Sequence, residues 1–131
     1  MGRIEKLTLY SLVLLLVWGN MVSGLGAGLA CPDWPLCFGS FFPEINFPIF
    51  MEHGHRVLGL FVTIFFAFLA RKRLKLYKGA YKLIPIICSI LLAVQIIAGA
   101  LVVILQLETN ITTFHFGNAI IIFILIYIMC T

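Results

Sequence analysis

The residues that could do chemistry in this 131-residue chain gather in three short segments. They are Cys31–Cys37, which begins and ends with cysteine; Glu52–Arg56, which reads Glu-His-Gly-His-Arg; and Thr113–Gly117, with a histidine between two phenylalanines. Imidazole, carboxylate and thiolate groups bind metals or transfer protons. The sequence therefore predicts metal or proton-transfer chemistry, carried by elements that are otherwise strongly apolar.

The composition indicates an integral membrane protein. Hydrophobic residues make up 63% of the chain, charged residues only 11%, and the mean hydropathy is +1.14. Soluble domains carry about 25% charged residues, and disordered chains are poor in apolar ones. Both classes are excluded, and we expect residues 1–131 to form a single membrane domain.

Four apolar stretches predict an all-α membrane protein, a four-helix transmembrane bundle, with spans at about 7–29, 50–70, 83–105 and 113–131. Eight of the nine Lys and Arg residues fall near the N-terminus or in the segment 71–82. Basic loops mark the cytoplasmic side, so both termini are expected on that side of the membrane. The membrane itself is expected to be the inner (plasma) membrane. The loops 30–49 and 106–112 then face outward. The net charge of +4 follows this orientation and does not indicate nucleic-acid binding.

The outer loop holds the first chemical signal, Cys31-Pro-Asp-Trp-Pro-Leu-Cys37. Two cysteines in a short loop on the oxidising face of a membrane predict a disulfide. Its role stays open between a loop staple, a redox-active pair and a rigid lid over a site beneath. Cys88 and Cys130 lie within spans, where a lone cysteine is normally a small buried hydrophobe.

The second signal opens the second span. Glu52 and His55 are three residues apart and share one helix face, and Arg56 follows Glu52 by four, which allows an ion pair. Ionisable residues within a span are functional candidates by default. His53 points about 200° away from His55, so we expect it to be an interfacial residue and not a ligand.

The third signal is His115, near the outer end of the fourth span. The topology places it at the same depth as His55. Two imidazoles at one level on different helices, flanked by Phe and Gly, suit a large planar ligand better than a compact zinc or copper site. They favour bis-histidine haem ligation within a four-helix bundle, with another metal or two structural histidines as the alternatives.

Three motifs together resemble the haem A synthase (heme A synthase) family: Gly26–Cys37, Glu52-x-x-His55-Arg56 and Phe114–Gly117. The resemblance implies oxidation of the C8 methyl group of haem O to a formyl group, with water as the oxygen source. It also implies haem ligation by His55 and His115 and an outer Cys31–Cys37 disulfide. Glu52, the only acid expected within a span, is the candidate catalytic residue, and Arg56 would support it or pair with a haem propionate.

The chain corresponds to one half of the usual eight-span member and resembles its N-terminal half, where substrate haem is thought to bind. The other half is associated with a haem b cofactor. This favours a homo-oligomer, a dimer or trimer, in which identical sites take both roles. The alternatives are one site that works without the second, or a fragment or paralogue that has lost activity. The resemblance also implies two partners: a haem O synthase, and a quinone or other electron acceptor.

Two other functions fit parts of the pattern. A non-catalytic bis-histidine cytochrome b would need the same histidines but neither Glu52 nor the disulfide. A membrane thiol oxidant would use the cysteines, but such enzymes usually carry a Cys-x-x-Cys pair, whereas five residues separate Cys31 from Cys37.

Overall fold

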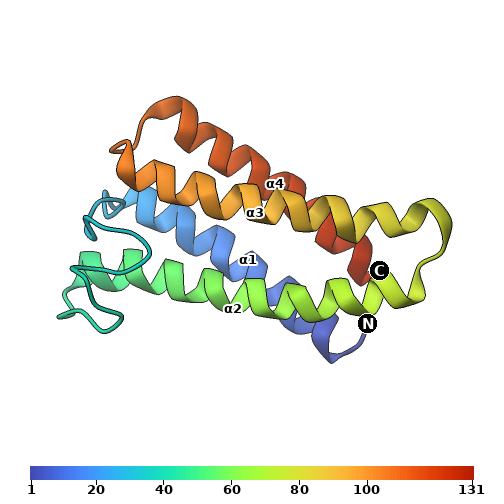
Figure 1. The fold of residues 1–131 in the computed structure, drawn as a ribbon. Helices are drawn as coiled ribbons and strands as arrows, with labels where there is room; N and C mark the ends of the chain where they lie inside the picture. Colours follow the sequence, from blue (N-terminus) through green and yellow to red (C-terminus); the bar gives the residue numbers. More distant parts are fainter.

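The computed structural model describes residues 1–131 as four helices that run side by side (Figure 1). They are α1 (Arg3–Gly24), α2 (Phe47–Leu76), α3 (Leu83–Ile104) and α4 (Thr109–Cys130), with one turn of 3-10 helix, η1 (Gly79–Lys82), before α3. The structure has no strand beyond an isolated bridge between Cys37 and Ser40. The predicted all-α four-helix bundle is confirmed.

The helices form two tightly packed pairs. α1 packs mainly on α2, and α3 packs mainly on α4, while α1 with α4 and α2 with α3 make smaller contacts. Going round the bundle, the order is therefore α1, α2, α3, α4. This order sets α2 diagonally opposite α4, and α1 diagonally opposite α3.

Three of the helical segments are long and apolar enough to cross a membrane: Arg3–Gly24, Gly79–Ile104 and Thr109–Cys130. Most of their large hydrophobic side chains are exposed, as lipid-facing helices require. A membrane location is thus supported. α2 is longer but carries charged residues near both ends, and its crossing stays a prediction.

The helix boundaries correct several predicted ones. α2 begins at Phe47 and not near 50, because the Asn46 side chain accepts the Ile49 N–H at 2.9 Å and caps the helix. It continues to Leu76, six residues past the predicted end, because Arg73 and Lys75 suit the negative end of the helix dipole. α4 begins at Thr109 and not near 113, with Glu108 as its cap. α1 covers Arg3–Gly24 in place of 7–29.

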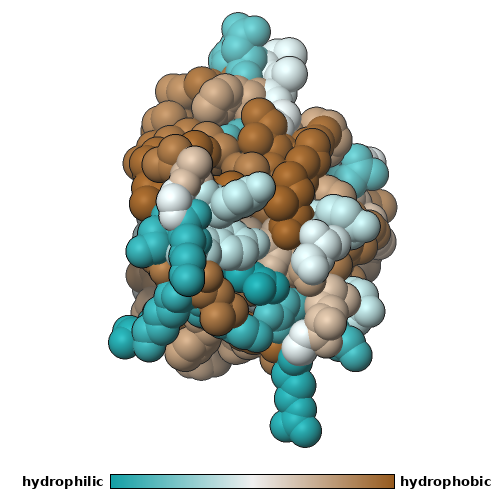
Figure 2. Space-filling view, turned by 90° about the vertical axis from the view of Figure 1, so that its right-hand side faces the viewer, coloured by the Kyte–Doolittle hydropathy of each residue, from teal (hydrophilic) through white to brown (hydrophobic).

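Both termini and the α2–α3 turn lie at one end of the bundle, which we call the basic end (Figure 1). The Leu25–Asn46 loop and the α3–α4 turn lie at the other, which we call the loop end. Figure 2 looks onto the basic end, where hydrophilic residues gather. The predicted grouping of the termini with the basic turn is confirmed; that this end is cytoplasmic stays a prediction.

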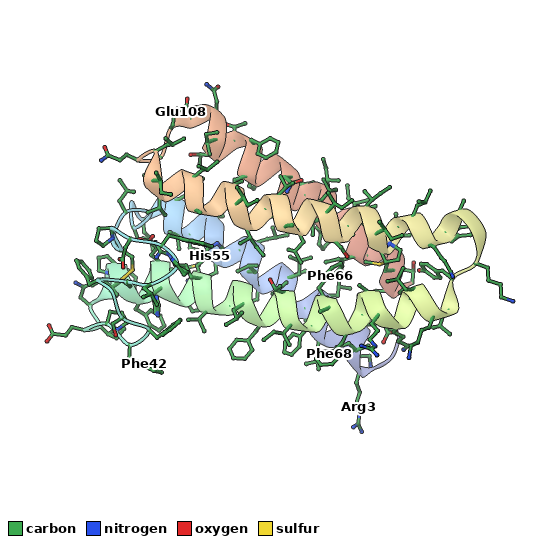
Figure 3. All side chains as sticks on the ribbon, viewed as in Figure 1. Arg3, Phe42, His55, Phe66, Phe68 and Glu108 are labelled. Atoms are coloured by element: carbon green, nitrogen blue, oxygen red, sulfur yellow. A yellow bond between two sulfur atoms is a disulfide. The ribbon has the colours of Figure 1, made fainter.

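A core of ten buried residues from all four helices fills the middle and the basic end. Phe66 faces this core and is 3% exposed, whereas its neighbour Phe68 points outward and is 62% exposed (Figure 3). At the rim, Glu5 of α1 is buried and pairs with Lys72 at 2.7 Å and Arg73 at 3.2 Å of α2. Glu52 is therefore not the only buried acid of the helices, and its being the only acid within a span stays a prediction.

Candidate functional site

The loop end is organised by an ion pair within the first turns of α2. Glu52 is 3% exposed, and one carboxylate oxygen pairs with Arg56 while the other accepts the backbone N–H of Cys31 at 2.7 Å. The four-residue spacing allowed this pair but left open a haem propionate as the partner of Arg56, and in the structure Arg56 pairs with Glu52. The bond to Cys31 joins the start of α2 to the outer loop.

Arg56 completes this connection. Its Nη1 donates to the carbonyl oxygens of Asp33 at 2.6 Å and Leu36 at 2.7 Å, and its Nη2 donates to that of Cys31 at 3.3 Å. A guanidinium presents its N–H donors in a fixed fork, so these bonds set the path of the loop over α2. Pairing of Arg56 with a propionate stays a prediction.

The loop itself is closed by a disulfide between Cys31 and Cys37, both fully buried. The predicted bond is present. Asp33 turns the loop by accepting the N–H groups of Phe38 and Gly39, each at 2.7 Å. These donors, that of Gly39 above all, lower the pKa of Asp33 below its ordinary value. The loop is thus a rigid cover whose carbonyl and amide groups hold Arg56 and Glu52.

His55 lies on α2 one helical turn after Glu52, near the loop end (Figure 3). Its ring is half-buried, and its Nδ1 is buried without a hydrogen-bond partner. The ring rests on Gly19 of α1, where an added Cβ would come within 2.8 Å of the ring carbon Cε1. Beside it, Trp18 packs on Gly54 and donates to the Met51 carbonyl at 2.8 Å. The two glycines allow the close approach of α1 and α2 that seats both rings.

His115 has a matching environment on the other helix pair. Its ring is half-buried, its Nδ1 is buried and unpartnered, and it rests on Gly99 of α3 with a closest Cβ distance of 3.2 Å. Gln95 of α3 donates to the His115 carbonyl at 3.0 Å, and Asn118 donates to the Gln95 side chain at 2.8 Å. This amide pair ties α3 to α4 at the histidine.

The two histidines lie on diagonally opposite helices at similar depth. His55 is eight residues from the start of α2, or about 12 Å, and His115 is six from the start of α4, or about 9 Å. Buried polar atoms without partners are rare and call for an explanation such as a ligand. Two imidazoles that approach from opposite sides are the donor set of a bis-histidine haem, so the residues present fit that group.

His53 lies at the loop end, and the prediction that it is interfacial and not a ligand stays a prediction. It is buried beneath the outer loop, with Nε2 at 2.8 Å from the Phe41 carbonyl, and its ring lies close to the Cys31–Cys37 disulfide. The loop path, which the α2 sequence does not specify, covers it. These three residues group closely, but sulfurs bonded to each other do not offer the thiolates that a metal needs.

Sequence reasoning missed Gln95, Asn118, Gly19 and Gly99. A signal was available for Gln95, an amide within the apolar third span, and for Asn118, one helical turn after His115. The glycines carry no such signal, because their role depends on which helix lies opposite.

Comparison with curated proteins gives a consistent result. The chain is 31% identical over 124 residues to the haem A synthase of Bacillus pumilus, which covers 92% of this chain. It is 30% identical to that of Geobacillus kaustophilus over 86% of the chain, and 32% identical to that of Staphylococcus saprophyticus over 85%. Over these residues the chain is similar in sequence to haem A synthases.

The similarity reaches across most of this chain but only part of each relative. The chain spans 40%, 36% and 38% of the length of these three haem A synthases. No family model matches the sequence, and no solved structure matches it. Haem-related chemistry is therefore what the relatives point to, while the residues that perform it must be argued from the site.

Proposed function

We propose that this chain binds haem O between His55 and His115 and oxidises its C8 methyl group to a formyl group, as the haem A synthase resemblance implies. The observation that carries the proposal is the pair of half-buried imidazoles on diagonally opposite helices, each seated on a glycine and each with an unpartnered Nδ1. The mainly apolar surroundings suit a porphyrin.

The proposed chemistry takes its oxygen from water. The methyl group and one water give a hydroxymethyl group, two electrons and two protons. A second water and a second two-electron oxidation give a gem-diol, which loses water to leave the aldehyde. The electrons pass to an acceptor such as a quinone, and a resident haem b would supply one-electron transfer on the way.

Glu52 is the proposed catalytic residue, because a buried carboxylate stabilises positive charge and accepts a proton from attacking water. Its two oxygens already serve Cys31 and Arg56. A carboxylate has about four lone-pair sites, so each oxygen can accept a further hydrogen bond, and the carboxylate can take up one proton. Arg56 would hold the carboxylate in position.

A further proposal concerns assembly. The 131 residues span about two fifths of the length of these relatives, and they carry one pair of candidate ligand histidines, His55 and His115. We propose a homo-oligomer, dimer or trimer, in the inner membrane with the disulfide loop outward. A haem O synthase would deliver the substrate.

The test is pigment analysis of the chain purified after co-expression with a haem O synthase. The haems would be extracted and identified by chromatography and mass. We expect haem A, or its hydroxymethyl intermediate, above an empty-vector control. Haem b as the sole pigment, with haem O available in the membrane, would contradict the proposal and favour a cytochrome b.

A pair of variants separates catalysis from loop anchoring. Glu52→Gln should keep haem binding and lose the formyl product. Asp33→Asn loosens the same loop without touching Glu52 and should keep the product. Normal haem A yield from Glu52→Gln, or equal loss in both variants, would remove the catalytic assignment.

A further inference from the structure

A groove runs between α2 and α3, from the middle of the bundle toward the basic end. It is open to its surroundings, and its volume of about 770 Å³ is comparable to that of small-molecule sites. Thr63, Ala67 and Ala70 line one side, and Ser89 and Ala93 line the other. The groove exists because α2 and α3 contact each other less than either contacts its own partner helix, and because these side chains are small.

The walls of the groove are apolar in effect. The Thr63 hydroxyl donates to the Gly59 carbonyl at 2.8 Å, and the Ser89 hydroxyl donates to the Pro85 carbonyl at 2.7 Å. Both polar groups are thereby satisfied by their own helix. The groove therefore offers no free hydrogen-bonding group along its length, and it suits a hydrocarbon chain.

The rim at the basic end is cationic. Arg71 and Lys75 line the groove there, and neither takes part in an ion pair, whereas Lys72 and Arg73 beside them are paired with Glu5. Two unpaired cations next to an apolar channel complement an amphipath with an anionic head.

The dimensions match one leaflet of a membrane. From Thr63 to Lys75 is twelve residues of helix, or about 18 Å. Half of a hydrocarbon core of about 30 Å is about 15 Å. A lipid whose phosphate lies at Arg71 and Lys75 would thus place one acyl chain along the groove down to the middle of the bilayer.

None of the five acidic residues in the sequence pairs with Arg71 or Lys75. Glu5 and Glu52 are buried and paired with other cations, and the other three acids lie at the loop end: Asp33, Glu44 and Glu108. An anionic group from another molecule would complement the two free cations, and basic pockets between membrane helices bind phospholipid head groups.

We propose that the groove between α2 and α3 is a binding site for one anionic phospholipid, with its phosphate on Arg71 and Lys75 and an acyl chain between the helices. This site is independent of the proposed haem chemistry, which uses the opposite end of the molecule.

Native mass spectrometry of the full chain in mild detergent tests this proposal. The protein is titrated with phosphatidylglycerol or with phosphatidylcholine of the same acyl chains. We expect one phosphatidylglycerol bound with a well-defined affinity, and phosphatidylcholine bound at least tenfold more weakly. Equal binding of the two lipids, or no retained lipid, would overturn the proposal.

Variants locate the site. Arg71→Gln with Lys75→Gln should weaken phosphatidylglycerol binding about thirtyfold, as two basic residues at an anionic head group would predict. Lys78→Gln with Lys82→Gln removes the same charge from the adjacent α2–α3 connection, outside the groove, and should change binding less than threefold. Equal loss in both double variants would show general surface attraction and contradict a built site.

A third variant tests the hydrocarbon channel without changing charge. Ala93→Phe fills the groove at an exposed position and should lower phosphatidylglycerol binding at least tenfold. Unchanged lipid binding would contradict the channel. A dimer that dissociates with Ala93→Phe while lipid binding is absent would mean that a second copy, and not a lipid, covers the groove.

Discussion

At the basic end the four helices share one continuous core, whereas at the loop end the buried apolar residues form only two clusters of three. The charged groups differ in the same way. Glu5 links α1 to two cations of α2, while Glu52 pairs within α2 and reaches out to the loop. Continuous packing gives stability, and unpartnered imidazoles leave room for a ligand. The difference indicates that stability and binding are carried by separate ends.

The largest expected effect tests the loop end. His55→Ala and His115→Ala should each abolish stable haem binding, because each removes one of the two proposed ligands, while the thermal stability of the apoprotein changes little. Absorption spectra of the purified variants measure bound haem.

His53→Ala is the matched control, since His53 faces the loop and the disulfide. It should retain haem at the level of the unchanged chain. Loss of haem from His53→Ala, with retention in His55→Ala, would reverse the assignment of the ligand.

The next effect tests the basic end. Glu5→Gln leaves Lys72 and Arg73 without their anion and should lower the free energy of unfolding by about 2 kcal/mol, a typical value for hydrogen bonds to a charged group. Haem affinity should stay the same. Thermal unfolding in detergent measures the change in stability. The control is Glu44→Gln, which changes an exposed loop acid. Equal destabilisation in both variants would contradict the division between the two ends.

The sequence was sufficient to predict the four helices, because apolar stretches near 20 residues long identify membrane helices directly. It was less informative about where helices end. Arg71 and Lys75 lie outside the apolar stretch, yet α2 continues through them because a cation is favourable at a helix C-terminus. Hydropathy marks the end of the hydrocarbon layer and not the end of the helix.

The candidate site was predictable where it depends on local spacing. The Glu52–Arg56 pair follows from four residues on one helix. Burial of Glu5 depends on Lys72, which is 67 residues away, and burial of His53 depends on the path of the outer loop. The contact between the His55 ring and Gly19 can be predicted only when α1 is known to lie against α2. Such contacts are set by tertiary packing, which single-residue patterns do not encode.

A smaller effect is expected from the two glycines that the histidine rings contact, Gly19 under His55 and Gly99 under His115. An added Cβ would lie 2.8 Å from the His55 ring at Gly19 but 3.2 Å from the His115 ring at Gly99. Gly19→Ala should therefore weaken haem binding about tenfold through overpacking, and Gly99→Ala about threefold or less. Haem titration of the apoproteins gives both values. Equal affinities would mean that the glycines do not position the rings.

The smallest effect concerns the loop that covers the site. Asp33 accepts two backbone N–H groups, and its lowered pKa means that this stabilisation is present at neutral pH and is lost as the pH falls through the lowered pKa. Asp33→Asn keeps one acceptor oxygen but removes the negative charge and the second acceptor, so the charge-dependent part of this stabilisation should be lost at every pH. Hydrogen exchange at the Phe38 and Gly39 amides should then be a few-fold faster in the variant at pH 6, and the two proteins should converge in strong acid. Exchange that is the same at pH 6 would show that the disulfide and Arg56 hold the loop, and that the loop end gains no rigidity from the charge of Asp33.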